Sequence, residues 1–304
     1  EVENLVKTYG DTRAVDGVSF AVEPGEIFGI VGPNGAGKTT IVESVEGLRH
    51  PDVGRIRVLG LDPIADRYEI TERLGVQLQE SRLQDKIRVN EALELYASFY
   101  RQPADWRDLL DRLGLGAKET ARYADLSGGQ KQRLAVALAL VGSPEVAILD
   151  ELTTGLDPQA RRDTWETIEE IKRSGVTVVL VTHFMEEADR LCDRIMVIDH
   201  GRISAIDTPA GLISRIGSEQ RLRFRPSEPL ADELLLELPD VVSVEHDGPQ
   251  TVVTGTGNVV HAVTSLLAQR RIIAQDLRIE QASLEDAYLA LTNDELVETG
   301  SEVR

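Results

Sequence analysis

The chain has 304 residues and a net charge of −19, from 33 Lys and Arg against 52 Asp and Glu. This length predicts one large domain with a smaller one, or two domains. The acidic balance disfavours a broad nucleic-acid footprint, and no apolar run approaches the roughly eighteen residues that span a bilayer. The single cysteine, Cys192, excludes an internal disulfide, is typical of a reducing compartment and is expected to pack rather than react.

Residues 1–31 predict short strands joined by glycine-containing turns, at 4–8, 15–22 and 27–31. The first residues show no charged-then-apolar leader, and we expect them to lie inside or just before a strand. Tyr9 precedes the next motif by about twenty residues, a position from which an aromatic ring either stacks on a purine or packs the turn. The spacing leaves both interpretations open.

Residues 32–40 read Gly-Pro-Asn-Gly-Ala-Gly-Lys-Thr-Thr and match G-x-x-x-x-G-K-[ST] between an apolar strand and a predicted helix at 41–47. The glycines let backbone N–H groups surround phosphate oxygens at the positive end of the helix. Lys38 is expected to reach the β and γ phosphates, and Thr39 to offer its hydroxyl to Mg²⁺. The motif predicts a nucleoside triphosphate site, against a glycine-rich turn that binds nothing, but kinases, GTPases, helicases and transporters share it.

The next segment predicts a half-exposed strand at 54–60 and a strand at 74–80. Gln79, at the end of the second strand, either contacts Mg²⁺ or the attacking water, or is a plain strand-end glutamine. Apolar residues then recur at three- and four-residue spacing over 90–100 and 106–113. These amphipathic helices predict a helical arm of about 85–140 that interrupts an otherwise α/β pattern.

Leu126-Ser127-Gly128-Gly129-Gln130 precedes an apolar helix that ends the arm. Ser127 is a natural N-cap, and the two glycines leave the following N–H groups unobstructed, which predicts a second anion site. One phosphate loop needs only one such cradle. The second helix start therefore suggests a contribution to the nucleotide of another subunit.

Residues 145–151 predict an apolar strand that ends in Asp150 and Glu151. At the carboxyl edge of a parallel sheet, Asp150 can hold Mg²⁺ and Glu151 can orient or deprotonate the attacking water; exposed strand-end acids are the alternative. A turn at 153–158 leads to a helix at 159–174, and the strand 177–182 ends at His183, which can hydrogen-bond a γ-phosphate or be structural. A helix at 185–192 and a hairpin at 194–206 close a nucleotide domain of residues 1–213.

The C-terminal region, 219–292, predicts a small α+β domain before a polar tail, 293–304. Strands are expected at 221–225, 241–245, 251–254 and 272–279, with helices at 230–238, 259–270 and 284–291. Their order, β-α-β-β-α-β, is that of a ferredoxin-like unit. His246 and His261 have no obvious partner, so we expect a dimer-stabilising or regulatory module, with a small-molecule sensor as the alternative.

Together these motifs resemble the ATP-binding subunit of an ABC transporter over residues 1–210. Residues 32–40 look like Walker A, Gln79 the Q-loop, 126–130 the LSGGQ signature and 146–151 Walker B. Residues 155–157 resemble the D-loop, His183 the switch histidine and Tyr9 the adenine-stacking aromatic. One departure is Leu152, where the family usually has proline. Leucine frees φ and restores an N–H, so we expect a less rigid D-loop and do not expect a loss of catalysis.

The resemblance implies an α/β fold with a P-loop NTPase core of the ABC type, a mixed sheet and a helical arm. It implies ATP and Mg²⁺ as cofactors, a homodimer in the ATP-bound state, no nucleic-acid partner, and a cytoplasmic, peripheral place on the cell membrane through a separate permease. Catalytic roles fall to Glu151, His183, Lys38 and Gln79, and Mg²⁺ contacts to Thr39, Gln79 and Asp150. The implied nucleotide contacts are Tyr9, Val15, Asn34, Gly35, Ala36, Gly37, Lys38, Thr39, Thr40, Ser127, Gly128, Gly129, Gln130 and Asp157.

Residues 14–20, 26–29 and 283–289 are similar to the ATPases of drug-exporting systems of the daunorubicin-resistance type. That similarity implies export of an amphiphilic compound and a role in drug or antibiotic resistance. The alternative is a non-transport ABC ATPase that acts on DNA, ribosomes or an assembly scaffold. Such proteins usually carry long coiled coils, tandem nucleotide domains or a basic surface, none of which is evident in the sequence. An ATP sensor without hydrolysis is disfavoured because Glu151 and His183 are both present.

Overall fold

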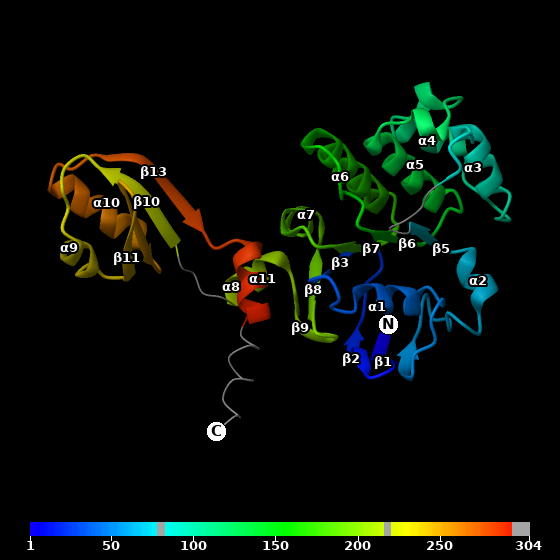
Figure 1. Cartoon of the computed structure of the whole chain (residues 1–304), viewed down its shortest axis with the longest axis horizontal. Helices are drawn as coiled ribbons and strands as arrows, with labels where there is room; N and C mark the ends of the chain where they lie inside the picture. Colours follow the sequence, from blue (N-terminus) through cyan, green and yellow to red (C-terminus); the bar gives the residue numbers. More distant parts are fainter. Residues whose placement is uncertain (78–82, 216–219, 294–304) are drawn as a thin grey trace. The chain divides into compact units, whose positions relative to one another are not determined.

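The computed structural model describes residues 1–77, 83–215 and 220–293 (Figure 1). Two compact units divide the chain, Glu1–Pro209 and Ala210–Arg304. Each unit has its own sheets and its own hydrophobic core, and each is described by itself.

A six-stranded sheet of order β5-β6-β7-β3-β8-β9 forms the centre of the first unit. All its pairs are parallel except β8 with β9, so the sheet is mixed, as predicted. The inner strands are aliphatic and buried, which is expected where both faces of a sheet are covered. The strands are β3 (Ile27–Val31), β5 (Leu74–Gln77), β6 (Val146–Asp150), β7 (Thr177–Thr182), β8 (Arg194–Asp199) and β9 (Arg202–Asp207).

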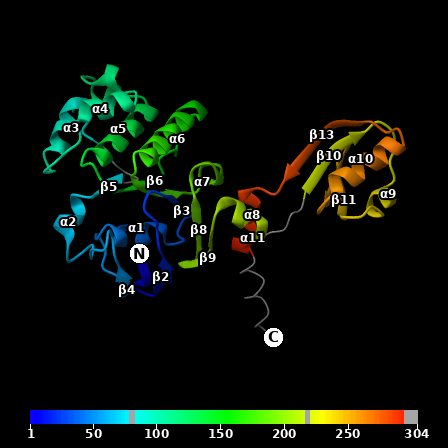
Figure 2. The same ribbon diagram turned by 180° about the vertical axis from the view of Figure 1, so that it is seen from behind.

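A three-stranded antiparallel sheet of order β2-β1-β4 lies on the same side of the central sheet as helix α1 (Figures 1 and 2). Its elements are β1 (Val2–Tyr9), β2 (Thr12–Phe20) and β4 (Val53–Ile56), and α1 spans Lys38–Val45. The strand predicted at 54–60 is wrong in its second half. Leu59 and Gly60 have φ of 53° and 81°, and the turn they form pairs Val58 only with Leu61.

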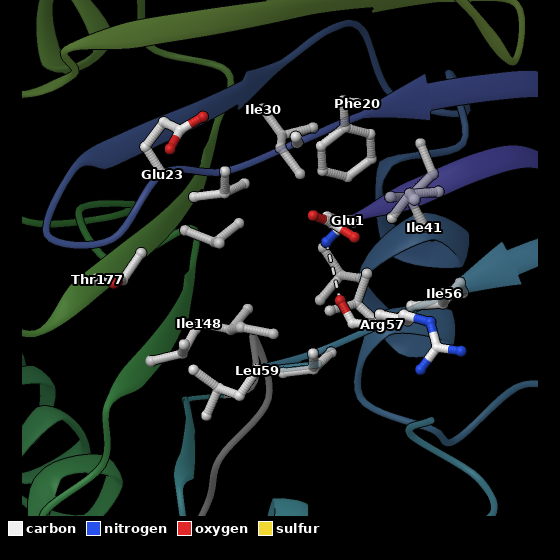
Figure 3. Close-up of a pocket in the computed structure, with 18 of the residues that line it drawn as sticks. Glu1, Phe20, Glu23, Ile30, Ile41, Ile56, Arg57, Leu59, Ile148 and Thr177 are labelled. Carbon is white, nitrogen blue, oxygen red and sulfur yellow. Dashed lines mark hydrogen bonds between the residues drawn. The ribbon is translucent and has the colours of Figure 1, made fainter. Parts of the chain in front are cut away.

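The hydrophobic core between these layers joins Leu5, Ile41 and Ile148 from the small sheet, α1 and the central sheet. It contains a cavity of about 310 Å³, which the aliphatic side chains of both sheets and α1 line (Figure 3). At the cavity, the backbone nitrogen of Glu1 donates to the Arg57 carbonyl at 2.8 Å. Because most of the lining is aliphatic, we treat this space as part of the core that supports α1.

Helices α5 and α6 cover the opposite side of the central sheet, together with the arm helices α3 and α4 (Figures 1 and 2). The helical arm was predicted, although α3 and α4 end earlier than expected. Helix α2 was not predicted, because five residues are too few to show a helical period. The helices are α2 (Arg67–Thr71), α3 (Val89–Ala97), α4 (Trp106–Arg112), α5 (Gly128–Leu140), α6 (Pro158–Arg173) and α7 (Met185–Leu191).

The single cysteine packs behind the sheet. Cys192 is buried, and its sulfur lies 2.7 Å from where a Cβ on Gly29 would stand, so any side chain at that glycine would displace it. Burial raises the pKa of the Cys192 thiol well above its ordinary value. A thiol held in its neutral form is a poor nucleophile, so the packing role predicted for Cys192 is confirmed.

The second unit is built on an antiparallel sheet of order β11-β12-β10-β13 over a core that includes Leu222, Phe224 and Val263. The predicted order of strands and helices is present. His246 does have a partner, contrary to expectation, because its Nε2 lies 2.9 Å from Asp232 Oδ1. The elements are α8 (Pro209–Arg215), β10 (Gln220–Pro226), α9 (Asp232–Leu236), β11 (Val241–Asp247), β12 (Gln250–Gly255), α10 (Val259–Gln269), β13 (Ala274–Gln281) and α11 (Leu284–Asn293).

Candidate nucleotide-binding site

The loop 32–37 connects the central strand β3 to α1 and packs closely against neighbouring backbone. A Cβ on Gly32 would stand 2.2 Å from the Ile198 carbonyl, and one on Gly37 would stand 2.4 Å from the Ala14 carbonyl. Gly37 also has φ of 102°, in the left-handed region that favours glycine. Helix α1 begins directly after Gly37 without a side-chain cap or an acidic residue in its first turn. Its first N–H groups are therefore open to an anion.

Lys38 folds its side chain back over this loop. Its Nζ donates to the carbonyls of Gly32 at 2.8 Å and Pro33 at 3.0 Å, and the side chain is buried. Burial lowers the pKa of the Lys38 ammonium, whereas the negative charges of Glu151 and Asp150 raise it. The ammonium is thus held at the centre of the loop, close to the two carboxylates.

Asp150 and Glu151 lie where β6 leaves the sheet. Burial and the charge of Glu151 raise the pKa of the Asp150 carboxyl to about 6, and Lys38 opposes that rise. Glu151 has φ of 50°, an uncommon left-handed conformation for a non-glycine residue, which turns the chain out of the strand. Its Oε1 lies 3.1 Å from Nδ1 of His183, the residue that follows β7. The carboxyl edge of the sheet therefore brings together Lys38, Asp150, Glu151 and His183.

Ser127 caps helix α5, as predicted. Its Oγ accepts from Gln130 N at 3.3 Å, and its own N–H donates to Gln130 Oε1 at 3.0 Å. A Cβ on Gly129 would stand 3.0 Å from Ala160 Cβ, so the start of α5 packs against α6. In the described part of the chain these neighbours belong to α5 and α6, not to the loop 32–37. A nucleotide contact from Ser127 and Gly129 to a second copy of the chain stays a prediction.

Other predicted nucleotide contacts differ in their exposure and in the groups that they contact. Tyr9 is 40% exposed at the end of β1, with the Arg49 guanidinium 5.5 Å from its ring centroid. Val15 is wholly buried behind Gly37. Asp157 uses Oδ1 to cap α6, accepting from the N–H groups of residues 159 and 160 at 3.0 Å each. Gln79 lies outside the described residues.

The sequence interpretation missed two polar side chains buried near this edge. The side chain of Gln77, on β5, accepts a hydrogen bond from Asp150 N at 3.1 Å and so connects β5 to the end of β6 next to the carboxylates. Glu187, on α7, lies between other charged residues in the sequence but is wholly buried. A signal existed for each: Gln77 ends an apolar strand, and Glu187 shares a helix face with Leu191 at the i+4 position.

The residues fit Mg²⁺ only if a nucleotide brings further ligands. Within residues 1–77, 83–215 and 220–293, no group of three or more His, Cys, Asp or Glu could hold a metal. The buried Asp150 carboxylate and the hydroxyl of Thr39, the second residue of α1, are oxygen donors of the kind Mg²⁺ takes alongside phosphates. The raised pKa of Asp150 marks a charge that a nearby cation would stabilise.

Glu46, just after α1, gives a prediction on pH dependence. Burial and the charges of Glu43 and Asp150 raise the pKa of its carboxyl from 4.5 to about 7, and both its oxygens are buried without a hydrogen-bond partner. Protonation of Glu46 therefore stabilises the folded state. This contribution is fully present below pH 4.5 and is lost as the pH rises through 7. Glutamine is neutral at every pH, whereas Glu46 is a buried charge at pH 8. The Tm of Glu46→Gln should therefore exceed that of the wild type by about 5 °C at pH 8 and match it near pH 5. Thermal unfolding across this range measures it, and parallel curves would contradict it.

The sequence and the fold are similar to those of known ATP-binding proteins. A family model described as "ABC transporter" matches residues 15–154. The Nod factor export ATP-binding protein I of Paraburkholderia xenovorans (strain LB400) is 40% identical over 97% of each chain. The daunorubicin resistance ATP-binding protein DrrA3 of Streptomyces coeruleorubidus is 34% identical over 97% of this chain and 96% of its own. A dimeric, post-hydrolysis ATP-binding cassette bound to ADP and Pi has a TM-score of 0.61 and 26% identity, over 68% of this chain and 97% of that one.

Proposed function

We propose, from the premise that this chain belongs to the family of ABC transporter ATP-binding subunits, that it hydrolyses ATP to power export through a separate transmembrane permease. One observation carries the catalytic part of this proposal. The Glu151 carboxylate and the His183 imidazole lie 3.1 Å apart at the sheet edge that also holds the buried Lys38. This arrangement supports the assignment of a base, a phosphate-sensing group and a cation to a bound γ-phosphate.

In the mechanism that follows, the loop 32–37 and the first turn of α1 bind the phosphates through backbone N–H groups. Lys38 exchanges its loop carbonyls for phosphate oxygens, and its charge offsets the charge that develops in the transition state. Glu151 orients the attacking water and takes its proton, and His183 hydrogen-bonds the γ-phosphate. Thr39, Asp150 and Gln79 would hold Mg²⁺, which screens the phosphate charge when bound.

The export part of the proposal rests on the relatives. Two are named for Nod factor export and daunorubicin resistance, so we propose that this chain serves export of an amphiphilic compound. Among the helices of the described residues, none is both long and apolar enough to cross a bilayer. The transport path would then belong to a permease, with this chain bound at the cytoplasmic face of the membrane. We assign the domain at 219–292 an accessory role in that complex.

Lys38→Ala tests the catalytic part. Removal of the ammonium should lower ATP turnover by about a hundredfold or more, because a buried cation is lost where transition-state charge develops. The exposed Lys86 offers a matched control, and Lys86→Ala should keep wild-type turnover. Phosphate release under saturating Mg²⁺-ATP measures both. Equal turnover in all three proteins would remove Lys38 from the mechanism.

Co-purification tests whether this chain binds a transmembrane permease. A transmembrane permease co-expressed with this chain should retain it through detergent extraction, and the complex should hydrolyse ATP in a Lys38-dependent manner. Recovery of the chain with ribosomes or DNA, and not with the permease, would favour the non-transport alternative.

A further inference from the structure

Glu187 is a fully buried carboxylate on α7, four residues after His183 in the sequence. Its Oε1 accepts a hydrogen bond from Trp165 Nε1, on α6, at 3.1 Å. Burial raises the pKa of the Glu187 carboxyl, whereas the approach of the Thr182 hydroxyl, the Trp165 N–H and the Thr153 hydroxyl lowers it, as does the charge of Arg161. Donors from three separate segments of the chain therefore converge on one carboxylate.

Each of these segments carries part of the candidate site. Thr182 is the last residue of β7 and directly precedes His183. Its hydroxyl oxygen accepts from Phe184 N at 3.0 Å, which leaves the hydroxyl proton for the carboxylate. Thr153 follows Glu151 by two residues, in the loop that leads to Asp157. Trp165 belongs to α6, the helix against which the start of α5 packs at Gly129.

The pairing around Glu187 is incomplete. Its Oε2 and the hydroxyl oxygen of Thr153 are both buried and lack an aligned hydrogen bond in the described structure. A buried acceptor and a buried donor left in this way each carry a desolvation cost. A small movement of the loop 152–157 toward α7 would satisfy both groups at once.

We propose that Glu187 is a positioning residue for ATP hydrolysis. It fixes the end of β7, with His183, in its position relative to the loop 152–157 that follows Glu151. In the productive state the Thr153 hydroxyl donates to Glu187 Oε2. This inference rests on the proposed ATPase function. Glu187 touches no nucleotide itself, and its role is to fix the distance between the base and the phosphate-sensing imidazole.

Glu187→Gln and Thr153→Val, alone and together, test the proposal in the full-length chain. Glutamine offers one acceptor oxygen where glutamate offers two, and valine removes only the hydroxyl. Each single variant should lower kcat for ATP about tenfold while the KM for ATP stays within about twofold, because the groups act on alignment and not on binding. The double variant should be no slower than the slower single variant, because both changes break one interaction. Glu186→Gln, the exposed neighbour on the same helix, should keep wild-type kinetics.

Three results would overturn the inference. If both single variants keep kcat within about twofold of the wild type while Tm falls, Glu187 has a structural role only. If their effects on kcat multiply in the double variant, Thr153 and Glu187 do not act through one bond. If Glu187→Gln fails to fold, Thr153→Val alone decides, and wild-type kcat in that variant would reject the proposal. A wild-type protein without ATP turnover would instead reject the proposed function itself, which separates the two failures.

Discussion

Glu151→Gln should lower ATP turnover by about 10²–10⁴-fold while ATP binding remains within about threefold of the wild type. The glutamine amide keeps the size and shape of the side chain but cannot accept the proton of the attacking water. The groups that bind phosphate are elsewhere, on the loop 32–37 and the first turn of α1, and they do not change. Phosphate release at saturating Mg²⁺-ATP measures turnover, and titration with a fluorescent ATP analogue measures binding.

The matched control is Glu145→Gln, just before β6, where the carboxylate pairs with Arg73 at 2.6 Å and is largely exposed. This variant loses a carboxylate at the opposite end of β6 from the site, and its turnover should be unchanged. Near-normal turnover in Glu151→Gln would identify another group as the base. Equal loss in both variants would trace the effect to the stability of β6 instead of the chemistry.

The parts of the site that the sequence predicted are those with local causes. The loop 32–37 needs its glycines at fixed positions, because backbone passes within contact distance of two of them. The N-cap of α5 follows from Ser127 and Gln130, three residues apart. The carboxylates could be placed at the sheet edge because β6 is a continuous apolar run that stops at Asp150.

The parts that sequence reasoning missed depend on residues distant in the chain. The hydrogen bond from Asp150 N to Gln77 joins residues that are 73 positions apart in the sequence, and no periodicity within β5 predicts it. Glu187 looks like one more surface acid of α7, and only the packing of α6 and the end of β7 around it shows a buried carboxylate. The partner of His246 was likewise missed, because Asp232 lies on a helix fourteen positions earlier in the sequence.

Glu151→Gln protein should double in mass with Mg²⁺-ATP and remain a monomer with Mg²⁺-ADP. The cap of α5 uses the N–H groups of Ser127 and Gln130, so those of Gly128 and Gly129 at the helix start are available to the γ-phosphate held by a second copy. Blocked hydrolysis should trap that closed pair, and light scattering after gel filtration measures its mass. A dimer with both nucleotides would assign dimerisation to another surface such as the domain at 219–292, and a monomer with both would contradict a shared site in the free chain.

A second substitution at Ser127 separates charge from helix capping in that experiment. Aspartate and asparagine both cap helices about as well as serine, so neither Ser127→Asp nor Ser127→Asn should weaken α5. Only aspartate puts a negative charge against the γ-phosphate, and it should therefore abolish the ATP-dependent dimer in the Glu151→Gln background, with ATP binding by each chain within about threefold. Asparagine should leave the dimer in place. If the two variants dimerise equally, the start of α5 does not face the nucleotide, and the sharing of one site by two chains is wrong.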